Sequence, residues 1–247
     1  MSIARYLPAE FQHEDQRLPP APTLTPVTGP VLATILPSTV ECEEHFGEPP
    51  GGALFPDEEK VVARAIERRR REFATVRHCA RVCLRRLGHE PVPILPGLGG
   101  APGWPDGVRG SMTHCDGYAA AAVGLAPFVT AIGIDAEPDA PLPDGVLELV
   151  ATPAEQALLA AIARVEDGPC WDRLLFSAKE AVYKAWCPVV CQWLDPQEAE
   201  IAFHPGRNTF TAVLSREGMM AGERPVVRLH GRWARHRGII LTAVILD

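Results

Sequence analysis

The chain contains few lysines and no long hydrophobic run, and both absences narrow the class of protein. Only three of its 24 basic residues are lysines, at positions 60, 179 and 184. No segment approaches the roughly 18 consecutive apolar residues of a transmembrane helix. The N-terminus also lacks the basic start and apolar stretch of a secretory signal. We therefore expect a cytoplasmic protein that does not associate with membranes.

The sequence also lacks closely spaced cysteine pairs. Its seven cysteines are scattered between positions 42 and 191 and include no C-x-x-C pair. That pattern predicts reduced thiols rather than disulfides or a zinc site. With 247 residues, 47% of them hydrophobic, the chain can bury a full core in one large domain or in two similar halves.

An excess of acidic residues argues against general nucleic-acid binding, but it does not exclude a local cationic surface. The formal net charge is −7, yet the segment 64–86 holds nine arginines against two acidic residues, Glu67 and Glu72. We expect most of these arginines to lie on a solvated helix face. A subset could bind a multiply charged anion through bidentate guanidinium contacts.

Proline and glycine positions, together with apolar periodicity, predict the elements of the first half. Residues 1–30 are rich in proline and predict an extended tail. A short strand is expected within 29–40, followed by a helical segment over 57–87 that divides into two helices or kinks near 71–74. A loop follows at 91–107, and two apolar segments have the pattern of neighbouring strands, at 118–125 and 128–137.

In the second half, predicted helices precede predicted strands. Thr152 and Glu155 form a capping box that opens a helix over 152–165. A second helix is expected over 171–186, stopped by Pro188. Strands are then predicted at 200–204, 208–214, 225–236 and 238–246. These blocks indicate an α+β fold, and the similar order in each half permits an internal pseudo-duplication.

The segment "GIDAEP" (133–138) ends an apolar strand with two carboxylates. Side chains alternate along a strand, so Asp135 and Glu137 share a face. Their Cα atoms would be roughly 6.5 to 7 Å apart, close enough for both to bind one Mg²⁺ ion. By themselves, the two carboxylates could equally be solvated residues at a strand end.

The segment "FSAKEAVYKAW" (176–186) places Glu180 and Lys184 one helical turn apart. The pair could be surface decoration that contributes about 0.3 to 0.5 kcal/mol. Alternatively, Glu180 completes a metal site or acts as a general base, while Lys179 and Lys184 contact phosphate oxygens. The segment "GSMTHC" adds Ser111 and His114 in a loop before a strand, although a lone histidine is more often structural.

Together these segments resemble the large, monomeric Sfp-type 4′-phosphopantetheinyl transferases. The matching segments, in the family's order, are "RRREFATVRHCAR", "GSMTHC", "GIDAEP" and "FSAKEAVYKAW", and the resemblance covers roughly residues 31–247. The third looks like the family's G-x-D-x-E metal motif, and the fourth like its F/W-S/C-x-K-E-x-x-x-K motif. The arginine-rich segment and "THC" look most like the actinobacterial and enterobactin-synthetase-associated branch.

The resemblance implies a pseudo-duplicated α+β fold with the active site in the cleft between two halves. We place a tail at 1–30, an N-terminal half at 31–126 and a C-terminal half at 127–247. The resemblance also implies that the enzyme is a monomer, and it implies the reaction that the enzyme catalyses. Coenzyme A donates its 4′-phosphopantetheine arm to a serine of an apo acyl or peptidyl carrier protein, with Mg²⁺, and adenosine 3′,5′-bisphosphate is released. Such carriers serve fatty-acid, polyketide, nonribosomal-peptide and siderophore synthesis.

The resemblance also implies roles for individual residues. Asp135, Glu137 and Glu180 would hold Mg²⁺. Glu180, directly or through a water, would be the general base, and Lys184 would stabilise the transferring phosphate and the leaving group. Coenzyme A would be bound by Lys184 and by a further set of side chains: Arg69 and Arg77 at the 3′-phosphate, with Ser111, His114 and Lys179.

One loop departs from the family pattern, and two alternatives stay open. Related enzymes usually carry a coenzyme A-binding lysine in the loop before "GWP", whereas this chain has Pro96 and no cation between positions 94 and 104. The first alternative is another Mg²⁺-dependent phosphoryl-transfer enzyme or a nuclease built on the three carboxylates. The second is a nucleic-acid-binding module that uses the arginine-rich helix; its binding should depend steeply on salt.

Overall fold

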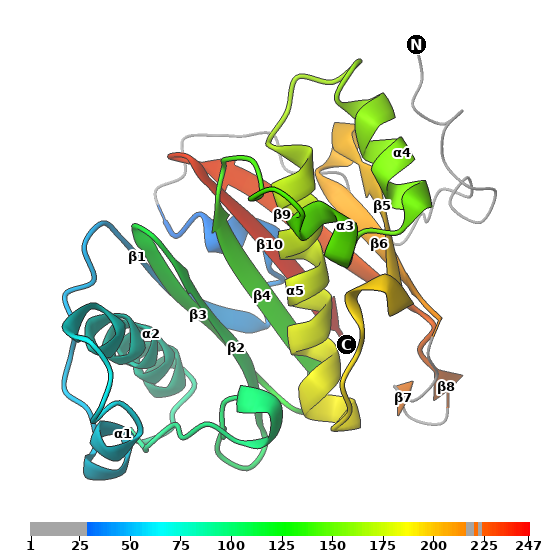
Figure 1. Ribbon diagram of the computed structural model, residues 1–247. Coiled ribbons are helices and arrows are strands. Elements are labelled where there is room, and N and C mark those ends of the chain that lie inside the picture. The colour runs from blue at the N-terminus through cyan, green and yellow to red at the C-terminus, as the bar shows by residue number, and fades with distance from the viewer. Residues whose placement is uncertain (1–28, 216–219, 222–223) are drawn as a thin grey trace.

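The computed structural model describes residues 29–215, 220–221 and 224–247. Most of the predicted tail, positions 1–28, lies outside the described residues. Within them, the chain forms two larger antiparallel sheets that lie side by side with helices packed on them, which confirms the predicted α+β class (Figure 1). No helix in these ranges is long and apolar enough to cross a bilayer.

Three strands form the first sheet, in the order β1-β3-β2. They are β1 (Val40–Phe46), β2 (Val108–Cys115) and β3 (Tyr118–Leu125). Helix α2 (Glu67–Arg86) packs on this sheet, and the shorter α1 (Pro56–Val61) precedes it. The side chains buried between α2 and the sheet are small or aliphatic: Cys79, Ala80, Cys83, Leu84, Ile94, Val108, Ala121 and Val123.

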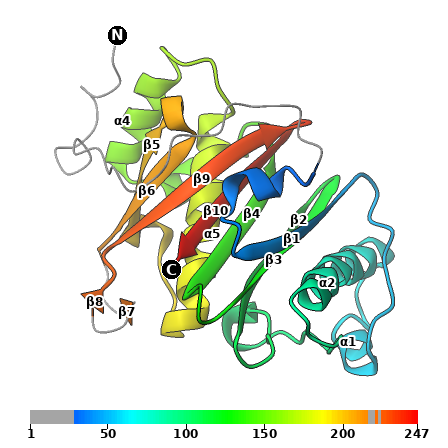
Figure 2. The same cartoon turned by 180° about the vertical axis from the view of Figure 1, so that it is seen from behind.

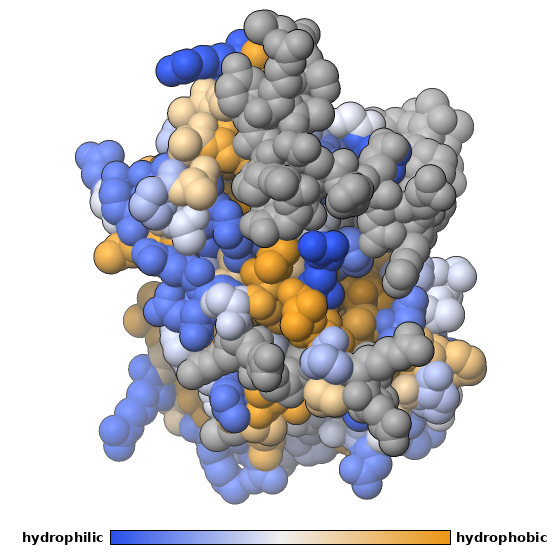
Figure 3. Space-filling view, turned by 90° about the vertical axis from the view of Figure 1, so that its right-hand side faces the viewer, coloured by the Kyte–Doolittle hydropathy of each residue, from blue (hydrophilic) through white to orange (hydrophobic). Residues whose placement is uncertain are grey.

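Five strands form the second sheet, in the order β4-β10-β9-β6-β5, with every neighbouring pair antiparallel. Their bounds are β4 (Ala131–Pro138), β5 (Ala199–His204), β6 (Thr209–Leu214), β9 (Arg228–His236) and β10 (Ile239–Leu246). Three helices cover one face: α3 (Val146–Val150), α4 (Pro153–Ile162) and α5 (Trp171–Val190). A small ribbon pairs β7 (Met220–Ala221) with β8 (Arg224–Pro225). Viewed from the side of these last strands, the surface mixes hydrophilic side chains with a central hydrophobic area (Figure 3).

The two sheets meet where β2 runs beside β4, and side chains join them. The Ser111 hydroxyl accepts a hydrogen bond from the Ile134 amide at 3.1 Å, and the Thr113 hydroxyl accepts one from the Ala136 amide at 3.1 Å. On the opposite face, the 3-10 turn η3 (Leu32–Ile35) packs across both sheets (Figure 2). Its Leu32 and Ile35 belong to a buried cluster shared by β1, β4 and β10. The two halves therefore share this cluster.

Helix α5 lies unusually close to β4, and Gly133 makes this possible. A Cβ atom at Gly133 would lie 1.9 Å from the Ala181 carbonyl oxygen of α5. No side chain larger than hydrogen fits at that distance, so the two backbones are in direct contact. The contact brings Asp135 of β4 next to the face of α5 that carries Glu180 and Lys184.

Two predictions in the first half are wrong in detail. The segment 29–40 does not hold a strand, because Leu32 and Ile35 point into the core from one turn of 3-10 helix and β1 begins only at Val40. The long helical segment does divide into two helices, but at 62–66 rather than 71–74. There the Arg70 side chain stabilises the turn, since it donates to the Val62 carbonyl at 3.0 Å.

Three further predictions are corrected. Ser111 and His114 lie within strand β2 rather than in a loop. Strands β3 and β4 are not neighbours in one sheet, because β3 pairs with β1 and β2 while β4 pairs with β10. Helix α5 continues past Pro188 to Val190, where partly buried valines still pack on the core, and ends at Cys191 in a left-handed conformation. The Thr152–Glu155 capping box and the C-terminal strands are confirmed.

Candidate active site

A cavity of about 490 Å³ lies between the α1–α2 segment, the loop 96–102, strand β2 and helix α5. Both halves of the chain thus contribute to its wall. Six of the residues singled out from the sequence line it: Arg69, Arg77, Ser111, His114, Glu180 and Lys184. Sequence positions more than a hundred residues apart are brought together here.

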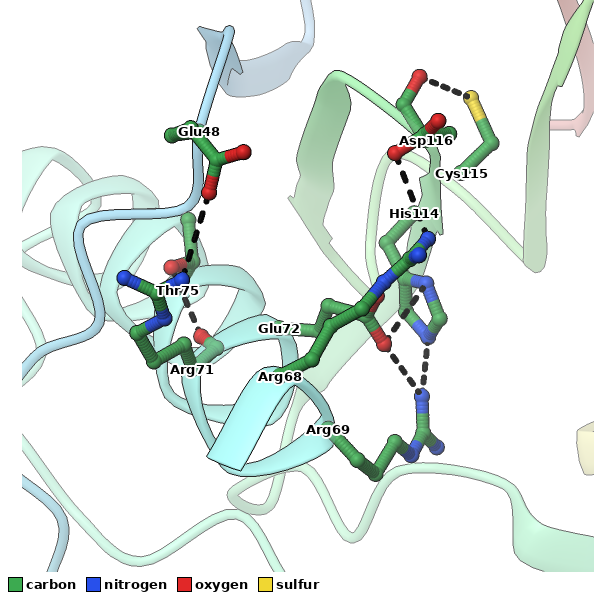
Figure 4. Close-up of polar contacts among 9 residues, drawn as sticks. All are labelled: Glu48, Arg68, Arg69, Arg71, Glu72, Thr75, His114, Cys115 and Asp116. Atoms are coloured by element: carbon green, nitrogen blue, oxygen red, sulfur yellow. Dashed lines mark hydrogen bonds and ion pairs between the residues drawn. The ribbon is translucent and has the colours of Figure 1, made fainter. Parts of the chain in front are cut away.

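Arg69 and His114 lie together at one end of this cavity. The Arg69 Nη1 atom is in hydrogen-bond contact with the His114 Nε2 atom, and Glu72 is nearby (Figure 4). Burial, and then the Arg69 charge, lower the pKa of His114 below its ordinary value. Guanidinium and imidazole groups are both side chains that bind phosphate in proteins.

Arg77 is buried in the wall and held by backbone carbonyls. Its Nε donates to the Ile94 carbonyl at 2.9 Å and its Nη1 to the Phe73 carbonyl at 3.3 Å. Burial lowers the pKa of Arg77 to about 10, and Glu58, 3.6 Å away, acts in the opposite direction. The guanidinium is therefore fixed in orientation at the cavity wall.

Most of the arginines in 64–86 are at least partly exposed, as expected of a solvated helix face, but most of those other than Arg69 and Arg77 are also paired with carboxylates. Arg81 forms a buried ion pair with Glu58 at 3.0 Å. Partly exposed pairs account for four more: Arg68 with Glu72, Arg70 with Glu59, Arg71 with Glu48 and Arg86 with Glu43. Since these charges are compensated locally, the helix does not present a free cationic face.

Asp135 is the most buried of the three predicted metal-binding carboxylates, at 4% exposed. Its Oδ1 accepts from Lys184 Nζ at 2.6 Å and from Thr113 Oγ1 at 3.2 Å. Its Oδ2 is buried and has no hydrogen-bond partner in the described part of the chain. A buried carboxylate oxygen without a donor fits a cation ligand.

Glu137 points to the same side and is paired with Arg173 of α5, whose Nη1 donates to Glu137 Oε2 at 2.8 Å. Burial, followed by the Asp135 charge, raises the pKa of Glu137 above its ordinary value. Arg173 also donates to two loop carbonyls, those of Ala140 and Pro141. The sequence offered no signal for this arginine, because its partner is 36 positions away.

Glu180 lines the cavity, is partly buried, and has no hydrogen-bond partner among the described residues. Burial raises the pKa of Glu180, the Asp135 charge adds to this, and Lys184 opposes it. Among the described residues, no three side chains of metal-binding type lie close enough together to hold a metal ion. The donor chemistry nevertheless fits Mg²⁺, since the Asp135 charge acts on both Glu137 and Glu180 and the buried Asp135 Oδ2 atom has no hydrogen-bond partner among the described residues.

Lys179 is not among the residues that line the cavity, so its position does not support the expected contact with coenzyme A. It is 5% exposed, and its Nζ is 2.8 Å from Glu155 Oε2 and 2.7 Å from the Pro196 carbonyl oxygen. Neighbouring positions on a helix point about 100° apart, so Lys179 and Glu180 face different surroundings. Lys179 joins α5, α4 and the turn η5 (Pro196–Glu198).

The end of the cavity formed by the C-terminal part of α5 is apolar, and sequence reasoning missed it. Tyr183 and Cys187 line it, and Trp193 packs on Tyr183 with ring centroids 5.0 Å apart. A signal was available, since Glu180, Tyr183, Lys184 and Cys187 follow the i, i+3, i+4, i+7 spacing of one helix face.

The loop that lacks the expected lysine also lines the cavity. Pro96 and Pro102 form an isolated β-bridge, and the Gly97 amide donates to the Ala101 carbonyl at 2.7 Å. Gly99 and Gly100, in the turn η4 (Leu98–Gly100), have positive φ of 63° and 81°. The loop thus brings backbone groups to the cavity rather than charge.

Comparison with known proteins gives concordant results. The family model described as "4′-phosphopantetheinyl transferase N-terminal domain" matches residues 57–124, and that described as "4′-phosphopantetheinyl transferase superfamily" matches residues 131–228. The chain is 50% identical over 217 residues to 4′-phosphopantetheinyl transferase Svp of Streptomyces mobaraensis, covering 87% of this chain and 88% of the relative. It is 44% identical over 226 residues to 4′-phosphopantetheinyl transferase PptT of Mycobacterium tuberculosis (strain ATCC 25618 / H37Rv), covering 88% and 99%. It is 45% identical over 222 residues to 4′-phosphopantetheinyl transferase Npt of Nocardia iowensis, covering 87% and 99%.

Proposed function

The chain belongs to the 4′-phosphopantetheinyl transferase family, and from this premise we propose how its residues carry out the transfer. Enzymes of this family transfer 4′-phosphopantetheine to carrier proteins. We propose coenzyme A as the donor, Mg²⁺ as the cofactor and a carrier serine as the acceptor. The observation that supports this most is the single cavity that joins Arg69 and His114 to Glu180 and Lys184, next to Asp135.

The reaction is a displacement at phosphorus. The serine oxygen forms a bond to the phosphorus that carries the pantetheine arm, and the bond from that phosphorus to the bridging oxygen breaks. Adenosine 3′,5′-bisphosphate leaves with the bridging oxygen, and the serine proton passes to a base. Positioning and charge stabilisation dominate the catalysis of such transfers.

Glu180 is the base in this proposal. It lines the cavity without a hydrogen-bond partner among the described residues, and without bound metal its pKa is raised by burial, so it then binds a proton more readily than an ordinary carboxylate. A base with a pKa closer to the working pH is a better proton acceptor in the transition state. The position of Glu180 allows the serine proton to pass to it directly or through one water molecule.

Lys184 supplies positive charge at the transferring phosphate and the leaving group. It lies one helical turn from Glu180, is partly exposed to the cavity, and is held by Asp135 at 2.6 Å. Asp135, Glu137 and Glu180 are the residues that would hold Mg²⁺. When bound there, the ion neutralises pyrophosphate charge.

The two ends of the cavity suit the two ends of coenzyme A. Arg69, Arg77 and His114 supply the cationic end for the 3′-phosphate, with Ser111 in the wall beside them. The pantetheine arm is uncharged and partly aliphatic, and it suits the apolar part of the wall at Tyr183 and Cys187. Lys179 has no place in this scheme, because its charge is already paired elsewhere.

One chain suffices for this site. Residues 31–126 contribute α2, β2 and the 96–102 loop, and residues 127–247 contribute β4 and α5, which supports two units with the site in the cleft between them. Because both walls come from one chain, we propose that the enzyme acts as a monomer. Acyl and peptidyl carriers of fatty-acid, polyketide, nonribosomal-peptide or siderophore synthesis are the proposed acceptors.

Intact-protein mass spectrometry tests the proposal. Several purified apo carrier proteins are incubated with the enzyme, coenzyme A and Mg²⁺, with and without EDTA, and in parallel with Asp135→Asn. A Mg²⁺-dependent gain of one phosphopantetheine by the wild type, lost in the variant, supports the proposal. Transfer that persists in EDTA, or in Asp135→Asn at the wild-type rate, would contradict the metal site.

A further inference from the structure

We propose that Glu72 is a positioning residue that sets the tautomer of His114 and orients Arg69 at the nucleotide end of the cavity. Its effect on ligand binding rests on the proposed function in one respect, the location of the coenzyme A 3′-phosphate at Arg69 and His114. Its effect on the tautomer of His114 in the free protein does not rest on the proposed function.

Glu72 lies at the centre of a charged cluster on one face of α2 (Figure 4). It follows Arg68 and Arg69 by four and three positions, a spacing that puts all three on the same side of the helix. Glu72 Oε1 accepts from Arg68 Nε at 2.9 Å, and Glu72 Oε2 is 3.6 Å from Arg69 Nη1. The Glu72 side chain is only 14% exposed, whereas those of Arg68 and Arg69 are 62% and 51% exposed. The partly buried Glu72 carboxylate thus contacts two arginines that are more exposed than it is.

The contacts of His114 determine where its proton lies. Arg69 Nη1 can only donate, so the His114 Nε2 atom that faces it must be the acceptor. The single proton of the neutral ring is then on Nδ1, and His114 Nδ1 is 3.9 Å from Glu72 Oε2. Glu72 favours this tautomer, because a carboxylate stabilises an N–H dipole that points toward it.

Binding of a phosphate changes what His114 must do. A lone pair on Nε2 repels phosphate oxygens, whereas a protonated Nε2 donates to them. Taking up that proton places a positive charge between Arg69 and Lys184, both of which oppose it, as does burial. Two carboxylates favour the charge, Glu72 from α2 and Asp135 from β4, but Asp135 already holds Lys184.

Glu72 therefore makes proton uptake at His114 possible when the ligand arrives. Its loss should leave His114 neutral at a pH where the wild type protonates it in the complex. Arg69 would lose its nearest carboxylate at the same time. Both effects weaken binding of the 3′-phosphate without touching the reacting atoms near Glu180.

Asp116 offers a matched control. It pairs with the same Arg68, at 3.3 Å, and it is two positions from His114 in the chain. Removing its charge changes the net charge by the same amount as Glu72→Gln. Among the described residues, neither Arg69 nor the His114 ring forms a hydrogen bond or ion pair with Asp116, so Asp116→Asn should leave every measurement below unchanged.

The first measurement is long-range ¹H–¹⁵N NMR correlation of the wild-type protein labelled at histidine nitrogens. We expect the His114 ring, identified by its loss in His114→Gln, to show the Nδ1–H tautomer. An Nε2–H tautomer would overturn the proposal. The same spectrum of Glu72→Gln should show a larger share of the Nε2–H tautomer, and an unchanged tautomer in that variant would overturn the role of Glu72; neither result depends on a ligand.

The second measurement is titration calorimetry with coenzyme A and with dephospho-coenzyme A, in buffers of different ionisation enthalpy. For Glu72→Gln we expect affinity for coenzyme A to fall about tenfold, within the usual range for coupled groups. Affinity for dephospho-coenzyme A should stay unchanged, and proton uptake on binding coenzyme A should decrease. Equal losses for both ligands, or unchanged proton uptake, would overturn the proposal.

Failure of the proposed function has a different signature. If the wild-type protein binds coenzyme A and dephospho-coenzyme A equally well, the location of the 3′-phosphate is wrong and the ligand role of Glu72 falls with it. The NMR result then still decides whether Glu72 sets the His114 tautomer.

Discussion

Replacement of Lys179 by methionine separates a structural role from a role in coenzyme A binding. Lys179 belongs to the K-E segment that resembles the family motif, and a phosphate contact was the expectation from the sequence. The structure places its Nζ between Glu155 and the Pro196 carbonyl, with both charged side chains under 5% exposed. Methionine keeps the apolar stem and much of the volume, so Lys179→Met removes chiefly the charge.

The structure indicates the size of the effect. Breaking a buried ion pair by removing one partner typically costs about 3 to 5 kcal/mol, because the remaining charge stays buried without compensation. Glu155 keeps two backbone donors, the amides of Thr152 at 2.7 Å and Ile201 at 2.8 Å, which moderate that cost. We therefore expect the free energy of unfolding to fall by about 3 kcal/mol. With a urea m-value of about 2 kcal/mol per molar, the unfolding midpoint should drop by about 1.5 M.

Urea unfolding followed by tryptophan fluorescence measures this loss, and steady-state kinetics in the absence of urea measures KM for coenzyme A. Lys60→Met is the matched control, since Lys60 pairs with Asp57 on the surface with 77% of its side chain exposed. It should change stability by at most about 0.5 kcal/mol. A Lys179→Met protein with near wild-type stability and a strongly raised KM for coenzyme A would refute the structural assignment.

Three further changes test the β4–α5 contact and the catalytic groups. Gly133→Ala should lower both the free energy of unfolding and kcat, because the new Cβ atom would lie 1.9 Å from the Ala181 carbonyl oxygen and must push α5 away from β4. An unchanged free energy of unfolding and an unchanged kcat would show that the contact can relax freely. At low Mg²⁺ concentration, where Glu180 is largely without metal, the wild-type kcat/KM should fall as pH drops through an apparent pKa above the ordinary carboxylate value, because burial raises the pKa of Glu180 and its basic form is lost early on acidification. Glu180→Gln should abolish turnover over the same pH range, and wild-type rates in that variant would exclude Glu180 as the base. Lys184→Ala should lower kcat more than it weakens coenzyme A binding, which single-turnover kinetics and calorimetry can separate; loss of affinity at constant kcat would assign Lys184 to ground-state binding.

Much of the candidate site was predictable because it lies in local motifs. Alternation along a strand placed Asp135 and Glu137 on one side, and helical spacing placed Glu180 and Lys184 together. The pairing of Asp135 with Lys184 across 49 positions was not predictable, because it depends on how closely β4 and α5 pack. Gly133 makes that approach possible, and the reason for a glycine there appears only in three dimensions.

Errors arose where tertiary packing overrides local signals. Pro188 predicts a helix end, but α5 runs on for two more residues because its last valines still bury apolar surface. Lys179 and Lys184 look equivalent as cations of one motif, and only the fold shows that one is buried against Glu155 while the other reaches the cavity. His114 lies in a strand rather than a loop because β2 pairs with β3 up to Cys115.

The Gly133 contact also limits how this enzyme can be redesigned. Two backbones that touch cannot be respaced by a rotamer change or by trimming a side chain, so the separation of Asp135 and Lys184 is inherited from the fold itself. The wall formed by 96–102 meets α5 through side chains instead, since a Cβ atom at Gly99 would first meet Cys187 Sγ at 3.1 Å, and only the positive φ of Gly99 and Gly100 limits substitution there. If the enzyme is evolved in the laboratory to use altered forms of coenzyme A, substitutions should therefore accumulate in residues 96–102 and leave β4 and α5 unaltered.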